Sequence, residues 1–464
     1  HHGLAQRLNI SSHDNLVRQF GHSTSANVSG EYHIAAHDGQ LDSFLRVLDD
    51  GALESAALAE IAVKNGETLG PLHGVPFALK DIVDVAGLPT TAHSQILAQQ
   101  PPKTDHAAVT AKLHDAGGIL LGKTATHEFA IGGPSFDLPW PPARNPWNRA
   151  RYPGGSSSGS GAAVAAGLVP MAIGTDTGGS VRNPATACGI VGMKPTYGRV
   201  SRRGVFPLSF SLDHVGPMTR NIADNALMLN VIAGHDPGDP GSANLPTPDF
   251  TADLDKGVDG LSIGVIRHFH NRDMTAEPAM AQALEDALDV LSDLGADISE
   301  IETAPLGEFA TCNRIILLSE AYAIHRNWLQ TRPEDYGESF LERILPGAFL
   351  SGSDYVDALR LRRKLTASFN RTISSLDGVI AVSAMDAAFA IDDAEEIALK
   401  YPRQARTPFN LTGNPALAMP NGFNDDGMPL AMQIVGKQFD EAMVYRIAAG
   451  YEAATDWHAQ RPPL

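Results

Sequence analysis

Two glycine- and serine-rich stretches carry the densest polar signal of the chain. The first is Pro153-Gly-Gly-Ser-Ser-Ser-Gly-Ser-Gly161, and the second is Gly174-Thr-Asp-Thr-Gly-Gly-Ser-Val-Arg-Asn-Pro184. Serine hydroxyls can act as nucleophiles, and glycines let a backbone approach a substrate closely. Each stretch alone is also typical of an ordinary flexible loop. Because the two flank one Ala-rich helix, expected over 161–167, and one strand, expected over 169–174, we expect them to lie together and shape a site.

Three familiar glycine-rich motifs do not fit these stretches. A phosphate-binding P-loop needs a lysine after its last glycine, and none follows Gly159 or Gly161. A dinucleotide-binding fingerprint fails because residues 162–164 are Ala-Ala-Val. The nucleophile elbow of α/β-hydrolases matches only loosely at 154–158, with no convincing Asp and His after it. What remains is a serine nucleophile that lacks a histidine.

A lysine can supply the base that such a serine needs. The segment Gly74-Val-Pro-Phe-Ala-Leu-Lys-Asp81 has a period of two, which predicts a strand that ends at Lys80. Burial there would lower the lysine pKa from about 10.4 toward 7–8, a shift worth roughly 3–5 kcal/mol. Most lysines at strand ends instead extend their amine into solvent. The residues alone leave both interpretations of Lys80 open.

The composition is that of a globular protein and argues against several other classes. Hydrophobic residues make up 43% of the 464 residues and charged residues 19%, which rules out general disorder. A net charge of −18 disfavours direct binding of nucleic acid or anionic lipid. The longest uncharged run of small or apolar residues, 161–174, is too short to span a membrane and is broken by Pro170. Cys188 and Cys312 form neither a disulfide framework nor a metal motif, and without a signal peptide we expect a cytoplasmic location.

The order of elements predicts an α/β fold built as one domain over 1–464. We expect a helical segment at about 1–70, a core that carries the chemistry at about 71–235, and a helical subdomain at about 305–375. Further short strands are predicted at 119–122, 261–266, 379–382, 416–419 and 430–435. Further helices are predicted at 105–117, 278–294, 311–330, 353–374 and 440–455.

Together these residues resemble the amidase signature family. The likeness rests on the two Gly/Ser stretches and the lysine strand, and it extends through segments 192–198, 213–219 and 429–457. It covers the chain from about residue 41 to the end. The resemblance implies a single domain with a mixed, twisted central sheet covered by helices on both faces. It implies no metal and no organic cofactor, and it suggests a homodimer.

The resemblance also implies a catalytic triad of two serines and a lysine. By motif, Ser180 is the nucleophile, Ser156 is the bridging serine in a non-proline cis peptide, and Lys80 is the base. Neutral Lys80 would take a proton from Ser156, which takes one from Ser180. Ser180 would then attack the carbonyl carbon and form an acyl-enzyme that water hydrolyses.

Neighbouring residues receive supporting roles from the same resemblance. Asp176 and Arg182 are expected to fix the second loop through charge-assisted hydrogen bonds, the alternative being an ordinary surface ion pair. Ser157 is expected to form a hydrogen bond within the site. The expected oxyanion hole consists of the backbone N–H groups of Thr177, Gly178, Gly179 and Ser180. The expected pocket lining includes Ile131, Gly132 and Gly133.

Several functions are compatible with this chemistry. The first is a stand-alone amidase that cleaves a C–N amide or carbamate bond of a small molecule. Five aromatic residues near the motifs favour apolar or aryl amides as its substrates: Phe129, Phe136, Trp140, Phe206 and Phe210.

The alternative is the glutaminase subunit of a tRNA-dependent amidotransferase, in which the same triad frees ammonia from glutamine for a partner subunit. Segments 197–201 and 427–457 resemble that glutaminase subunit. Asn183, where the glutaminase subunit usually carries Gln, and Pro139–Pro142 depart from it. A third candidate is a ureido or carboxybiuret-type hydrolase, which the region 331–363 resembles. The sequence does not identify the substrate.

Overall fold

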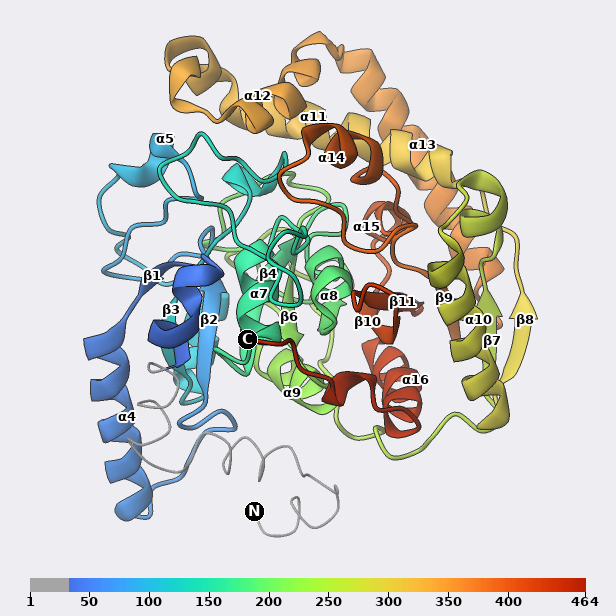
Figure 1. Ribbon diagram of the computed structural model, residues 1–464, viewed down its shortest axis with the longest axis horizontal. Coiled ribbons are helices and arrows are strands. Elements are labelled where there is room, and N and C mark those ends of the chain that lie inside the picture. Colours follow the sequence, from blue (N-terminus) through green and yellow to red (C-terminus); the bar gives the residue numbers. More distant parts are fainter. Residues whose placement is uncertain (1–32) are drawn as a thin grey trace.

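One sheet of eleven strands runs through the part of the chain that this computed structural model describes, residues 33–464 (Figure 1). Its strands are β1 (Phe44–Val47), β2 (Pro76–Lys80), β3 (Ile119–Thr124), β4 (Met171–Asp176), β5 (Val191–Lys194), β6 (His214–Thr219), β7 (Ser262–Val265), β8 (Asp297–Glu300), β9 (Gly378–Val382), β10 (Ala416–Phe423) and β11 (Pro429–Val435). The strand order is β1-β3-β2-β4-β6-β5-β10-β11-β9-β7-β8. β2 pairs in parallel with β3 and β4, whereas β4, β6, β5, β10, β11 and β9 pair antiparallel in turn. The predicted mixed sheet is therefore confirmed.

Helices cover both faces of this sheet. They are α4 (Asp49–Lys64), α5 (Gln95–Ala98), α6 (Ala108–Asp115), α7 (Ser158–Ala165), α8 (Arg182–Cys188), α9 (Ile222–Ile232), α10 (Pro278–Asp293), α11 (Leu306–Thr331), α12 (Glu338–Ile344), α13 (Gly352–Thr372), α14 (Ala394–Lys400), α15 (Thr407–Thr412) and α16 (Glu441–Ala453). α11, α12 and α13 lie together along the upper edge of Figure 1, in the region predicted as helical. Among residues 33–464, no helix combines the length and apolar character that a membrane span requires.

The alternating side chains of β2 pack into two different hydrophobic cores. Phe77 and Leu79 pack into the larger core, while Ala78 packs into a second core with residues of α4, α7 and α8. Successive side chains of a strand point to opposite faces, so the period-two pattern of the sequence becomes two packed faces. The small Ala78 lets α7 lie close to the sheet, and α7 carries the first serine-rich stretch.

α7 begins earlier in the chain than the sequence pattern predicts. The expected start was residue 161, but the helix already includes Ser158 and Gly159. A Cβ at Gly159 would lie 2.2 Å from the Ser43 carbonyl oxygen, and one at Gly161 would lie 2.6 Å from the Pro184 side chain. Close packing of α7 against its neighbours therefore requires these glycines, although glycine disfavours a helix by itself.

The N-terminal prediction was partly wrong. Residues 1–32 lie outside the described residues. Within the rest of the predicted helical segment, α4 is a helix, but Phe44–Val47 forms the strand β1 and pairs antiparallel with β3. Four residues of an edge strand give too short a pattern to compete with the helical spacing of the surrounding apolar residues.

Candidate active site

Lys80 ends β2 with its amine buried in the protein. The residue is 0% exposed, and its Nζ lies 2.7 Å from Ser156 Oγ and 2.8 Å from Thr175 Oγ1. Burial lowers the pKa of Lys80 to about 7, although the charges of Asp213 and Asp176 act in the opposite direction. The interpretation of Lys80 as a solvent-exposed strand end is therefore wrong. A substantial fraction of neutral amine is present near neutral pH.

Ser156 lies two residues before the start of α7, and its preceding peptide bond, Gly155–Ser156, is cis, as predicted. The serine is 0% exposed. Its carbonyl oxygen accepts a hydrogen bond of 3.0 Å from the His127 N–H. A Cβ at Gly155 would lie only 2.2 Å from the His127 ring and 2.8 Å from the Tyr152 hydroxyl. Only glycine fits at this position between the imidazole and Ser156.

Ser180 lies in the turn between β4 and α8 and is half-buried. Its carbonyl oxygen accepts a hydrogen bond of 3.3 Å from the Ser157 N–H, which joins the two serine-rich stretches. Within residues 33–464, the Ser180 hydroxyl makes no hydrogen bond. The structure thus forms the link from Lys80 to Ser156, while the link from Ser156 to Ser180 is not formed and stays a prediction.

The expected oxyanion hole needs one correction. The Gly179 N–H donates to Asp176 Oδ1 at 2.7 Å, so this donor is committed to a buried carboxylate. The N–H groups of Thr177, Gly178 and Ser180 make no hydrogen bond within the described part of the chain. Gly179 has a φ of +128°, which L side chains rarely adopt. Three backbone donors of the loop, rather than four, are left to face a substrate oxygen.

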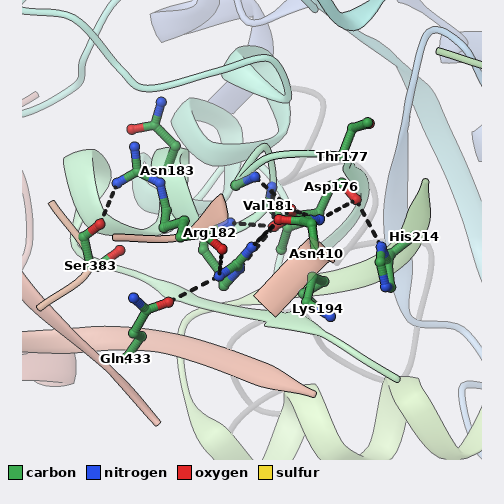
Figure 2. Close-up of polar contacts among 12 residues, drawn as sticks. Asp176, Thr177, Val181, Arg182, Asn183, Lys194, His214, Ser383, Asn410 and Gln433 are labelled. Carbon is green, nitrogen blue, oxygen red and sulfur yellow. Dashed lines mark hydrogen bonds and ion pairs between the residues drawn. The ribbon is translucent and has the colours of Figure 1, made fainter. Parts of the chain in front are cut away.

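Asp176 and Arg182 form a buried ion pair (Figure 2). Both side chains are 0% exposed, and two parallel contacts of 3.0 and 3.1 Å join the guanidinium to the carboxylate. Although burial raises the pKa of Asp176, the Arg182 guanidinium holds that pKa well below its usual range. Arg182 also donates to Asn410 Oδ1 at 2.7 Å and to Gln433 Oε1 at 2.9 Å. The alternative of a surface ion pair is wrong. The buried pair holds in place the loop that carries Ser180.

Ser157 forms its expected hydrogen bonds with one residue of β4. Its Oγ donates to the Thr175 carbonyl oxygen and accepts from the Thr175 N–H, both at 3.2 Å. A Cβ at Gly174 would lie 2.9 Å from this hydroxyl, so the strand must lack a side chain there. Thr175 therefore touches both Ser157 and Lys80.

Sequence reasoning missed Thr175, Asn410 and Gln433. Thr175 belongs to the second serine-rich stretch, and its position at the end of the strand predicted there is the signal that could have identified it. Asn410 in α15 and Gln433 in β11 are separated from Arg182 by 228 and 251 residues and belong to no motif. Their role becomes visible only when the fold brings α15 and β11 next to α8.

The predicted pocket residues lie apart from the larger cavity. Gly133 lines a small cavity with His127 and Tyr152, whereas Gly132 lies against Ser339, and Ile131 is half-buried against the core. A cavity of about 540 Å³ is lined instead by residues that include Thr175, Thr177, Phe206, Phe210 and Asp213.

The aromatic residues near the motifs do not form one wall. Of the five, Phe206 and Phe210 line the larger cavity. Phe129 is buried against the His325 ring, and Phe136 is 54% exposed. Among residues 33–464, no group of three or more His, Cys, Asp or Glu side chains is placed to hold a metal ion.

The chain is similar to known proteins over most of its length. The family model for amidases matches residues 31–445. The A subunit of glutamyl-tRNA(Gln) amidotransferase from Chloroflexus aggregans is 38% identical, with 93% of each chain covered. The solved structure of a peptide amidase from Stenotrophomonas maltophilia has a TM-score of 0.82 and 31% identity over 95% of both chains. A chain from a vestigial protein complex that reveals the evolutionary origins of an s-triazine catabolic enzyme has a TM-score of 0.86 and 33% identity, over 92% of this chain and 94% of its own.

Proposed function

The chain belongs to the amidase signature family, and from this membership we propose that it hydrolyses a C–N amide bond through an acyl-enzyme on Ser180. The observation that carries the proposal is the buried contact of 2.7 Å between Lys80 Nζ and Ser156 Oγ. A lysine whose pKa is about 7 is half neutral at pH 7 and can act as a general base there.

The proposed relay first passes a proton from Ser180 through Ser156 to Lys80, and later passes it back. Neutral Lys80 accepts the Ser156 proton while Ser156 accepts the Ser180 proton, and Ser180 Oγ bonds to the carbonyl carbon. The free N–H groups of Thr177, Gly178 and Ser180 stabilise the oxyanion. The relay then returns the proton to the leaving nitrogen as the C–N bond breaks. Water, deprotonated by the same relay, hydrolyses the ester and regenerates Ser180.

Two candidate substrates follow from different observations. The similarity to the A subunit of an amidotransferase favours glutamine, with a partner protein that uses the ammonia, over a stand-alone enzyme. Asn183 favours a stand-alone enzyme, because it departs from the glutaminase subunit directly at the site. Its Nδ2 donates to the Gly155 carbonyl oxygen at 3.2 Å, next to the bridging serine. A ureido-type substrate is the second candidate, within the stand-alone class, and it follows from the resemblance of region 331–363 to ureido hydrolases.

The test compares the wild-type protein with Ser180→Ala on a panel of aryl amides, aliphatic amides, carbamates, ureido acids and glutamine. Mass spectrometry would follow the products and the acylated protein. We expect a substrate-dependent mass increase on the wild type and none on Ser180→Ala. Ser158→Ala is the matched control, because it removes a neighbouring serine hydroxyl outside the relay. Turnover by Ser180→Ala at the wild-type rate would refute the assignment. Turnover of glutamine alone would favour the role of a glutaminase in an amidotransferase.

A further inference from the structure

Arg406 precedes α15 and lies against the loop that carries Ser180. The residue is only 4% exposed. A Cβ at Gly179 would lie 2.6 Å from Arg406 Nε, so the guanidinium is in contact with the residue directly before the proposed nucleophile. The methyl group of the next residue, Thr407, would lie 3.5 Å from a Cβ at Gly178. Arg406 therefore lies beside Gly179, and Thr407 beside Gly178, in the loop that would surround a bound carbonyl group.

The Arg406 guanidinium has no carboxylate partner within residues 33–464. Its Nη1 donates to the Ser383 carbonyl oxygen at 2.9 Å, and its buried Nε has no hydrogen-bond partner among the same residues. Burial, and next the charge of Arg182, lower the pKa of Arg406 to about 10, which still leaves the group charged at neutral pH. A buried charge without a counter-ion is costly, and a bound anion removes that cost.

The surroundings of Arg406 add positive charge and little negative charge. The Arg343 guanidinium lies 5.5 Å from the centre of the Tyr401 ring. Burial raises the pKa of Tyr401, while the charges of Arg343 and Arg406 both lower it, so both guanidinium groups act on the same phenol. Asp176 is the carboxylate whose charge acts on Arg406, and it is already bound by Arg182.

We propose that Arg406 binds a carboxylate of the substrate, so that the enzyme acts on amides that carry a carboxylate a few bonds from the scissile carbonyl. Arginine suits this role because its planar N–H groups match a carboxylate. The inference rests on the proposed hydrolysis at Ser180. Because the described residues around Arg406 offer no free acidic side chain, an ammonium group next to that carboxylate is disfavoured. Glutaramate, which is glutamine without its amino group, therefore fits better than glutamine.

The reaction on such a substrate balances without a further reactant. Ser180 Oγ bonds to the amide carbon of glutaramate, the C–N bond breaks, and the relay proton leaves with ammonia. Water then cleaves the glutaryl ester, so glutaramate and water give glutarate and ammonia. The distant carboxylate stays on Arg406 throughout and orients the chain of the substrate.

The experiment measures kcat/KM for malonamate, succinamate and glutaramate, for the corresponding neutral diamides, and for glutamine. We expect the wild type to prefer at least one acid over its diamide by about tenfold or more, and glutaramate over glutamine. Arg406→Gln should reduce the preference for the acid to within about threefold, and Arg406→Lys should retain part of it. Arg403→Gln is the matched control, because Arg403 is paired with Asp386 and should leave the preference in place. Equal rates on acid and diamide, or a preference that survives in Arg406→Gln, would overturn the proposal.

A binding measurement covers the case in which Arg406→Gln fails to fold. Calorimetry on Ser180→Ala, with Arg406 intact, compares glutaramate with glutaramide, and we expect at least about tenfold tighter binding of the acid. If the wild type hydrolyses amides but neither rate nor binding distinguishes acid from diamide, the role of Arg406 is refuted and the hydrolysis stands. If no amide is hydrolysed but the acid still binds preferentially, the hydrolysis fails and the carboxylate site stands.

Discussion

The pH dependence of the reaction gives the sharpest test of Lys80. With a pKa of about 7, half of Lys80 is neutral at pH 7, whereas an unshifted lysine of pKa 10.5 would be only about 0.03% neutral. We expect kcat/KM to rise with pH and to level off above about pH 8. At pH 6 it should be about a tenth of the plateau, and at pH 5 about a hundredth.

Asp213 provides the perturbation that identifies the titrating group. Its negative charge favours protonated Lys80 and so raises the pKa of that amine. Asp213→Asn removes this charge, and the acid limb should move to lower pH, which increases the rate at pH 6. The substitution keeps the local hydrogen bonds. The amide oxygen can accept from the N–H groups of Leu208 and Ser209, and the amide nitrogen can donate to the Thr177 hydroxyl.

The assay uses an amide that does not ionise between pH 5 and 9, with rates measured at substrate concentrations far below KM. Glu128→Gln is the control, because burial raises the pKa of Glu128 to about 7 as well. We expect this variant to keep the wild-type limb. An acid limb that is unchanged in Asp213→Asn, or one that disappears in Glu128→Gln, would refute Lys80 as the base.

Three further predictions concern stability. Arg182→Met leaves a buried carboxylate unpaired and should lower the free energy of unfolding by about 3–5 kcal/mol, measured by urea denaturation. Arg203→Met is the comparison, because the Arg203 side chain is 48% exposed in its ion pair with Asp236, and it should lower that free energy by about 1 kcal/mol or less. Gly155→Ala places a Cβ 2.2 Å from the buried His127 ring and should destabilise the folded protein by about 1–3 kcal/mol. Gly51→Ala is the comparison, because Gly51 lies in α4 with open space around it, and this substitution should stabilise the protein by about 0.5–1 kcal/mol. Because the pKa of Lys80 is lowered in the folded protein, the unfolded chain binds more protons than the folded one between pH 7 and 10.5. The free energy of unfolding of the wild type should therefore rise with pH over that range, by up to about 5 kcal/mol in total, and Lys80→Met should lack this rise. Parallel slopes of stability against pH for the two proteins would contradict the prediction.

The strand that ends at Lys80 and the two serine-rich stretches could be predicted because their signals are local, whereas the sequence left open whether the lysine is buried. Each signal lies within about ten residues of sequence. One is a period-two pattern that ends in a lysine, and the others are two short segments rich in glycine and serine. The strands β5 and β6 were not predicted, although they lie at the centre of the sheet. They contain Gly192, Gly216 and Pro217, which are typical of loops in a sequence read without its fold. A Cβ at Gly216 would lie 2.0 Å from the Met193 carbonyl oxygen, so close strand packing requires glycine there.

Two arginines show why the remainder of the site needed the structure. Arg182 and Arg406 lie near the same loop, and the Nη1 of Arg182 even donates to the Arg406 carbonyl oxygen at 2.9 Å. Every N–H group of the Arg182 guanidinium has an acceptor, and its carboxylate partner is buried beside it. A fully satisfied guanidinium has no donor left for a ligand, so Arg182 can only hold the loop in place. Within residues 33–464, Arg406 keeps an unpartnered buried Nε and lacks a carboxylate, so the same kind of side chain is left with the capacity to recognise an anion.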